Sequence, residues 1–310
     1  MSKKGRHHYI PVFYLKQWAE DNGQVCEFSK PYDRVKPRRT HPDGTGYYDG
    51  LNTVEGLPPD EAQFLEEVFF KIADDAAARA LRILFTPSPW SLTRVERSGW
   101  SRFILSLMIR NPQSVRKHKE VALALFRKVL SRIEESYARD HGPNDPPTYA
   151  EYARIHGPNP EGRTIVRVLQ SLFDNAEIGR QINSMRWLVL SARFPRFPLL
   201  TSDRPVLITN GIGLPNAKII LPISPSHIFL ATNNAETENK IRAVWRSGDA
   251  IPAINDRVAS QSRKYVYGTD DKQLSFVSKR LGLSHTADPL ENLSAEALIA
   301  GAFAGLEGQS

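Results

Sequence analysis

The chain has 310 residues, of which 41% are hydrophobic and 24% are charged, and this apolar content excludes a disordered chain. Its one cysteine can form neither an internal disulfide nor a zinc-finger cage. No apolar run reaches the roughly 20 residues of a membrane span, and the basic opening lacks the apolar stretch of a secretory signal, so we expect a cytoplasmic protein without a membrane segment.

The formal net charge of +7 favours a polyanionic partner, either nucleic acid or a phosphorylated small molecule. A basic protein can also lack such a partner, and no known nucleic-acid-binding module is recognisable in this sequence.

Residues 1–57 predict β structure and loops. Asn22-Gly23 is a turn signal that leads into a strand over residues 24–28. Residues 36–50 are rich in Pro, Arg, Asp and Gly, and they predict a surface loop or an irregular β element.

Residues 58–185 predict a helical part, because apolar residues recur there every three or four positions. The expected helices cover about residues 60–84, 93–110, 112–140 and 168–182. Thr93 and Glu96 have the spacing of a capping box for the second helix. Asn111-Pro112 ends that helix and starts the third, since proline disfavours a helical residue before it and suits the first turn of a helix.

Residues 186–285 predict short antiparallel strands with helices. Strand-like runs cover residues 187–191, 205–209, 218–221, 227–232 and 265–267, and helices are expected around 237–246, around 255–264 and in a short stretch ending near residue 281. The fold class is therefore α+β. We expect one domain over residues 1–285 and a mobile or weakly helical tail over 286–310.

The most distinctive segment runs from Arg6 to Trp18 and holds two histidines, two tyrosines and a tryptophan. Chain starts are more often polar and frayed, so we expect this segment to be fixed in place. If it is extended, His7 and His8 point to opposite sides. Two interpretations stay open: these residues only anchor the segment on the body of the protein, or one histidine serves a functional site.

The run His-His-Tyr-Ile-Pro-x-Phe-Tyr-Leu-Lys over residues 7–16 resembles the opening of a mainly bacterial family catalogued as domain of unknown function 4238. Three further segments fit the resemblance, namely Arg-Asn-Pro at 110–112, Leu-Thr-Ser-Asp-Arg-Pro-Val at 200–206 and Leu-Pro-Ile-Ser-Pro at 221–225. The resemblance spans most of the chain and implies no activity. It assigns no role to the helix expected over residues 60–84.

Thr201-Ser202-Asp203 lies between an apolar run and a strand, where it can either form a turn or present Asp203 as a general base or metal ligand. The resemblance places this triplet in a family that also keeps a histidine and an arginine. We therefore hypothesise a catalytic site of His8, Arg110 and Asp203, which supply a proton shuttle, a fixed cation and a carboxylate, with a divalent metal as one option.

Residues close to these three in sequence are expected to contact the substrate. They are His7, Tyr9, Tyr14, Thr201 and Ser202.

Arg116, Lys117 and Arg127 lie on charged faces of the longest predicted helix. Such a face is most often solvated, but it could also contact phosphate. Two functions stay open: an enzyme, such as a hydrolase, acting on a phosphorylated or nucleic-acid substrate, or a non-catalytic module that binds nucleic acid or another protein. Clustering of the motif residues in one polar cleft favours the enzyme, and separate burial of His8 and Asp203 favours the module.

Overall fold

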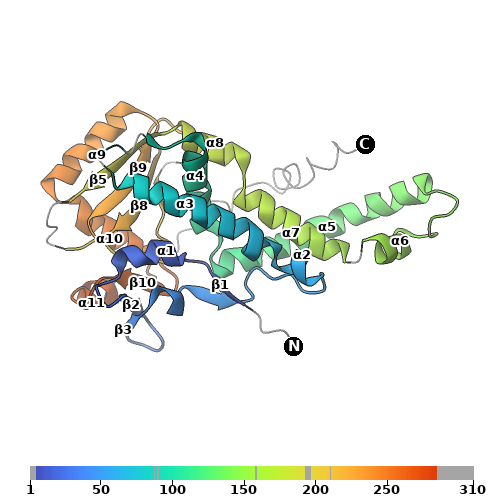
Figure 1. The fold of residues 1–310 in the computed structure, drawn as a ribbon, viewed down its shortest axis with the longest axis horizontal. Coiled ribbons are helices and arrows are strands. Elements are labelled where there is room, and N and C mark those ends of the chain that lie inside the picture. Colours follow the sequence, from blue (N-terminus) through green and yellow to red (C-terminus); the bar gives the residue numbers. More distant parts are fainter. Residues whose placement is uncertain are drawn as a thin grey trace.

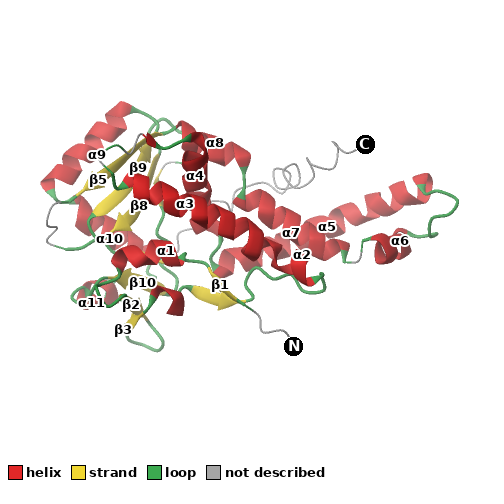
Figure 2. Cartoon of the chain, in the orientation of Figure 1, coloured by secondary structure: helices red, strands yellow, loops and turns green. Residues whose placement is uncertain are grey.

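The computed structural model describes residues 5–86, 88, 91–157, 159–192, 197–209 and 211–284. It confirms the predicted α+β class, with strands near the start, helices in the middle and antiparallel strands with helices later in the chain (Figures 1 and 2). The tail predicted over residues 286–310 lies outside the described residues. Within the described ranges, we find no helix that combines the length and the apolar character needed to cross a membrane.

The early part of the chain forms two antiparallel strand pairs. Strand β1 (Arg6–His8) pairs with β4 (Tyr47–Asp49), and β2 (Val25–Ser29) pairs with β3 (Lys36–Thr40). Three short helical turns connect them, namely α1 (Val12–Leu15), η1 (Lys16–Trp18) and η2 (Pro42–Gly44). The predicted first strand is β2, and the segment expected as a loop or irregular β element contains β3 and β4.

The aromatic start of the chain is fixed in the core, as expected. The side chains of Tyr14, Leu15 and Trp18 are fully buried. The Trp18 indole N–H donates to the Leu199 carbonyl at 2.8 Å, and the Tyr14 hydroxyl donates to the Pro222 carbonyl at 2.7 Å. Because these partners lie 181 and 208 positions later in the chain, the opening segment joins the early and late parts of the fold.

The first long helix changes its winding along its length. It begins as α2 (Pro59–Phe64), continues as the π-helix η3 (Leu65–Phe70) and ends as α3 (Lys71–Leu84). The apolar spacing predicts this helix but not its π segment.

Both predicted helix starts around Thr93 and Asn111 are confirmed. The Thr93 hydroxyl accepts from the Glu96 amide at 3.3 Å, and the Glu96 carboxylate accepts from the Thr93 amide at 2.8 Å, which starts α4 (Arg94–Ile109). The Asn111 side chain accepts from the Ser114 amide at 3.0 Å and starts α5 (Pro112–Asp140).

Helix α5 extends away from the rest of the molecule together with α6 (Tyr149–His156), as an arm (Figure 1). Helix α6 lies in a stretch rich in Pro, Asn and Gly for which no helix is predicted. The fourth predicted helix is two helices, α7 (Pro160–Phe173) and α8 (Ala176–Ser184). The break occurs because the Asn175 side chain accepts from the Ile178 amide at 3.0 Å and caps a new helix.

The late sheet is antiparallel throughout and has the order β5-β9-β8-β7. Its strands are β5 (Arg186–Ser191), β7 (Leu207–Thr209), β8 (Lys218–Ser224) and β9 (His227–Thr232). Side chains alternate between its faces, so Ile219 and Leu221 join one core cluster with α4, whereas Ile228 and Leu230 join a second cluster with α10 (Ala250–Gln261). Helix α9 (Ala235–Ser247) lies on the same side as α10 (Figure 1).

The predicted strand at residues 265–267 is β10 (Tyr265–Gly268), and it does not join the late sheet. It pairs with β2 on one side and with β6 (Thr201–Ser202) on the other, which gives a second sheet of order β3-β2-β10-β6. The short helix α11 (Leu274–Ser278) follows. This sheet joins the first part of the chain to the last part described.

Candidate functional site

The two adjacent histidines of β1 lie in different surroundings, as their extended backbone predicts. His7 is 2% exposed, and its Nδ1 accepts from the Asn52 amide at 3.0 Å. His8 is half-buried; its Nε2 donates to the Asp43 carbonyl at 3.2 Å, and its ring lies edge-on to Tyr47. Because a carbonyl oxygen only accepts, Nε2 of His8 carries the hydrogen, and Nδ1 keeps the lone pair.

The π-helix η3 brings a second residue to this region. Glu66 lies in η3, and its Oε2 accepts from the Asn52 side-chain amide at 2.8 Å and lies 3.9 Å from Nδ1 of His7. In a regular α-helix, residues eight apart such as Glu66 and Asp74 are offset by roughly 80°. One extra residue taken up by a π turn reduces that offset to roughly 20°, so both carboxylates can share one face.

Arg110 follows the last turn of α4 and is 1% exposed. Its two terminal nitrogens each lie 3.2 Å from Oδ1 of Asp74, and its guanidinium lies over the Phe70 ring, 5.2 Å from the ring centre. Its Nε is buried and has no hydrogen-bond partner among the described residues. Asp74 keeps a side-chain exposure of 26%, so a ligand can reach the carboxylate that holds this buried cation.

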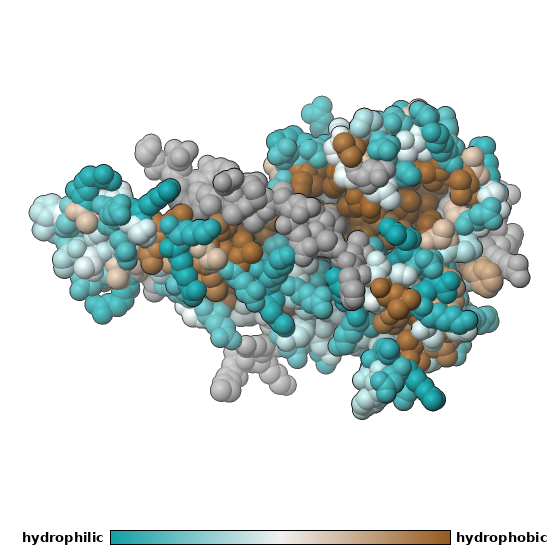
Figure 3. All heavy atoms as spheres, turned by 180° about the vertical axis from the view of Figure 1, so that it is seen from behind, coloured by the Kyte–Doolittle hydropathy of each residue, from teal (hydrophilic) through white to brown (hydrophobic). Residues whose placement is uncertain are grey.

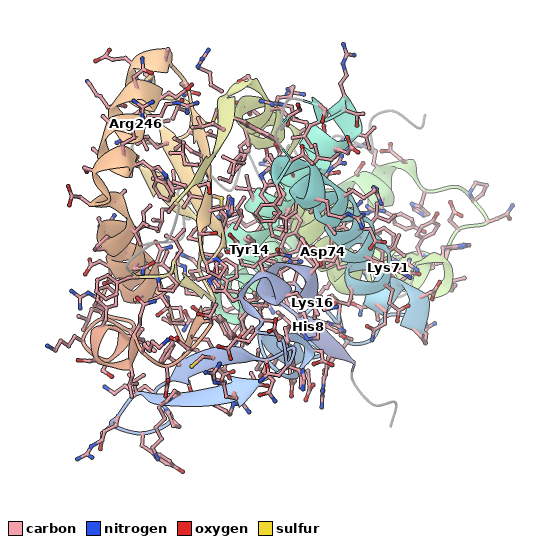
Figure 4. The ribbon with its side chains drawn as sticks, turned by 60° about the vertical axis from the view of Figure 1, so that its left-hand side comes forward. His8, Tyr14, Lys16, Lys71, Asp74 and Arg246 are labelled. Carbon is pink, nitrogen blue, oxygen red and sulfur yellow. The ribbon has the colours of Figure 1, made fainter. Side chains whose placement is uncertain are left out.

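His8, Glu66, Asp74 and Arg110 act on one another electrostatically. Burial lowers the pKa of His8, and Arg110 lowers it further, against the opposing effects of the Asp43 carbonyl and Glu66. Burial raises the pKa of Glu66 and of Asp74, against the stabilising charge of Arg110. We call these four residues the His8–Arg110 group. Figure 4 shows His8 and Asp74 on neighbouring elements, with Lys16 and Lys71 on the same side of the molecule.

The hydrogen-bond partners of Asp203 lie outside the His8–Arg110 group. Asp203 is 3% exposed; its Oδ1 accepts from the Arg263 amide at 2.8 Å, and its Oδ2 accepts from the Lys264 and Tyr265 amides at 2.6 and 3.1 Å. A carboxylate bound by three backbone amides fixes the turn that enters β10, which favours the turn interpretation of the Thr-Ser-Asp triplet. The carboxylate that contacts Arg110 belongs to Asp74.

The residues predicted to contact substrate are all buried, with exposures of 4% or less. The Thr201 hydroxyl bonds to the Tyr14 hydroxyl at 2.7 Å, and the Ser202 hydroxyl accepts from the Arg204 amide at 3.2 Å. Tyr9 donates its backbone amide to the Gly46 carbonyl at 2.9 Å. These contacts favour an anchoring role for His7, Tyr9, Tyr14, Thr201 and Ser202.

Arg116, Lys117 and Arg127 are exposed on α5. Their neighbour Lys119 instead points inward, where its Nζ donates to the Leu51 and Thr53 carbonyls at 2.8 and 2.9 Å. Arg116 also lines a cavity of about 440 Å³ between α5 and the segment around residues 48–55. The basic helix therefore has one lysine that fixes a loop and arginines that face solvent.

Sequence reasoning missed Asn52, Glu66 and Asp74. The available signal was the presence of acidic residues at 66, 67 and 74 in a helix whose later half is rich in alanine. Within the described ranges, no three His, Cys, Asp or Glu side chains are grouped so as to hold a metal ion, and the divalent metal stays a prediction.

Residues 6–272 match the model of a family described as Protein of unknown function (DUF4238). No curated protein and no solved structure matches the chain.

Proposed function

We propose that the chain, which belongs to the DUF4238 family, is an enzyme that uses general acid–base catalysis on a phosphorylated substrate. The observation that carries the proposal is the His8–Arg110 group, in which a histidine, two carboxyls and a buried guanidinium from three separate parts of the chain affect one another's charge state. Ionisable groups with shifted pKa values and a π segment are both frequent at functional sites.

His8 is suited to act as the base. Its pKa is lowered by burial, so it is neutral at pH 7, and its Nε2 is occupied by the Asp43 carbonyl. The lone pair on Nδ1 is then available to accept a proton.

Glu66 and Asp74 are suited to supply the acid. Burial raises the pKa of both carboxyls, and two acids near one cation titrate as a coupled system that can retain a proton. In the hydrolysis of a phosphoester, a water oxygen would bond to phosphorus while its proton passes to Nδ1 of His8. The bond from phosphorus to the leaving oxygen would break, and this oxygen would take the proton held by one of the two carboxyls.

The preference for an anionic substrate is supported by charge. Arg110 provides a fixed buried cation, and Lys16 and Lys71 are exposed on the same side as His8 and Asp74 (Figure 4). The net charge of +7 would attract phosphorylated molecules and nucleic acids over a distance. We also propose a cytoplasmic location, where both kinds of substrate occur.

The test is a hydrolysis assay with p-nitrophenyl phosphate, bis(p-nitrophenyl) phosphate and single-stranded RNA and DNA. Wild-type protein should hydrolyse at least one of them, and His8→Ala and Asp74→Asn should each reduce kcat by about 100-fold or more. His41→Ala is the matched control, because His41 also donates to a backbone carbonyl at 3.2 Å, from an exposed position. The proposal would be overturned if the His8→Ala variant hydrolysed the substrates at the wild-type rate, or if the wild-type protein hydrolysed none of them.

A non-catalytic module is the second candidate, supported by the exposed Arg116 and Arg127 on the arm helix α5. If the chain binds nucleic acid through this helix, the affinity should fall steeply with salt, and Arg116→Gln with Arg127→Gln should reduce the slope of that dependence by about 2. Measurement by fluorescence anisotropy would separate this function from hydrolysis, since the His8 and Asp74 variants should then bind normally.

A further inference from the structure

A cavity of about 540 Å³ lies between the β7 edge of the late sheet and helices α9 and α10. None of the residues of the His8–Arg110 group lines it. Its walls are mainly apolar and include Val206, Leu207, Ile220, Ile241, Val244 and Ile254. Figure 3 shows hydrophobic atoms gathered on this face of the molecule, with hydrophilic atoms around them. The volume and the lining are typical of a small-molecule site.

Polar groups gather at one part of this cavity. Thr209 of β7 lies directly opposite Lys218 of β8, so their side chains share one face of the sheet, and both line the cavity. The Thr209 hydroxyl oxygen is buried and has no hydrogen-bond partner among the described residues. A buried hydroxyl without a partner is costly, and a ligand with an acceptor atom would remove that cost.

Two positively charged side chains in the cavity wall form no ion pair with any described residue. Lys218 is half-buried and Arg257 is exposed on α10, and in the part of the chain that the structure describes neither forms an ion pair. Lys240, which also lines the cavity, differs from them because it pairs with Glu236 at 2.6 Å.

We propose that this cavity binds a small anionic amphiphile, with an aliphatic body and one carboxylate, such as a medium-chain fatty acid. The aliphatic body lies against Ile220, Val244 and Ile254. The carboxylate accepts hydrogen bonds from Lys218 and Thr209 and is attracted by Arg257. Because an apolar cavity with an unbalanced positive charge complements both parts of such a molecule, a neutral amphiphile of equal length binds less tightly.

The test is calorimetric titration of the full chain with octanoate, decanoate and dodecanoate, and with decanol. Affinity should rise about fourfold per added CH₂ until the cavity is filled, which is what about 0.8 kcal/mol per CH₂ corresponds to. Decanol should bind at least about tenfold more weakly than decanoate, and Lys218→Gln and Arg257→Gln should each weaken decanoate binding by about fivefold to tenfold.

Two further variants complete the experiment. Ala253→Trp places a large side chain at an exposed position in the cavity wall and should abolish binding while the melting temperature is kept. Arg246→Gln removes an exposed cation from α9 that does not line the cavity (Figure 4) and should leave binding unchanged. Equal affinities for decanoate and decanol, insensitivity to Lys218→Gln and Arg257→Gln, or no saturable binding below about 1 mM would each overturn the proposal. The outcome is independent of phosphoester hydrolysis, because the two sites share no residues.

Discussion

Both terminal nitrogens of Arg110 lie 3.2 Å from the same oxygen of Asp74, yet the arginine side chain is 1% exposed and the aspartate side chain 26%. The pair therefore has one buried partner and one partner that solvent can reach. This asymmetry allows Arg110 to support a charged group at the surface without being exposed itself, and it makes the pair a structural element as well as a candidate site.

Arg110→Met should lower the free energy of unfolding by about 3 kcal/mol, because removing one partner of a buried ion pair leaves the other uncompensated, and the partial exposure of Asp74 keeps the loss at the lower end of the usual range. Urea denaturation monitored by circular dichroism gives this difference. Arg102→Met is the control on the same helix, since the Arg102–Asp174 pair is exposed on both sides and should contribute less than about 1 kcal/mol. Equal losses in both variants would contradict the prediction.

Asp203→Ala should destabilise the protein by at least about 3 kcal/mol, because it leaves three backbone amides near the start of β10 without their acceptor. Any hydrolytic activity should persist per folded molecule, which requires kcat to be measured below the melting temperature of the variant. Asp256→Ala removes a partly exposed carboxylate that pairs with Arg280 and should cost less than about 1 kcal/mol. If Asp203→Ala were stable but inactive, this prediction would be wrong and the original hypothesis that Asp203 is a catalytic residue would be supported.

The stability of the protein should fall as the pH drops below 6.5. Burial lowers the pKa of His7 in the folded state, so the unfolded chain binds a proton first, and stability is lost as the pH falls through the folded pKa. The raised pKa values of Glu66 and Asp74 act in the opposite direction, with stability lost as the pH rises through their folded values.

Comparison of wild type with His7→Gln isolates the histidine. The variant should lose less stability than wild type between pH 7.5 and pH 5.5 in urea titrations. A His7 titration midpoint above 6.5 by NMR would show that the sign is wrong.

Deletion of Val68 should convert the π segment η3 into regular α-helix. Glu66 and Asp74 would then lie seven positions apart and should keep their offset of roughly 20°, because the deletion removes the one residue that the π turn takes up. The Asn52–Glu66 hydrogen bond and hydrolysis per folded molecule should therefore be retained. Val68→Ala shortens a side chain that is 43% exposed without changing the winding, and it should change stability by less than about 0.5 kcal/mol. Loss of hydrolysis in a stably folded deletion variant would contradict this prediction and would show that the π winding itself positions the site.

The parts of the fold that the sequence predicts are those with local signals. Helices α4 and α5 begin where expected because Thr93 and Asn111 find their partners within three residues. The opposite orientations of His7 and His8 follow from an extended backbone alone.

The missed parts depend on contacts between distant segments. The π segment η3 packs Phe70 against Phe173, with ring centres 4.6 Å apart, and nothing within the helix sequence specifies that partner. From the sequence alone, Glu66 and Asp74 are typical of the solvated face of an amphipathic helix. Their partners Asn52 and Arg110 come from other segments and are known only from the structure. The sequence likewise does not distinguish whether the Thr-Ser-Asp triplet forms a turn or belongs to a catalytic site. The amides that the Asp203 carboxylate binds lie 60 to 62 positions later in the chain.

Cys26 of β2 lies opposite Gly268 of β10, so strand β2 lacks this neighbouring strand until residue 268 has been synthesised. At about 5–20 residues per second, strand β2 would leave the ribosome roughly 12–50 s before its partner is made. During this interval the side chains of Val25 and Phe28, which are fully buried in the finished fold, would be accessible beside an unpaired strand edge. Slow translation before residue 268 would lengthen this interval and would favour aggregation over folding.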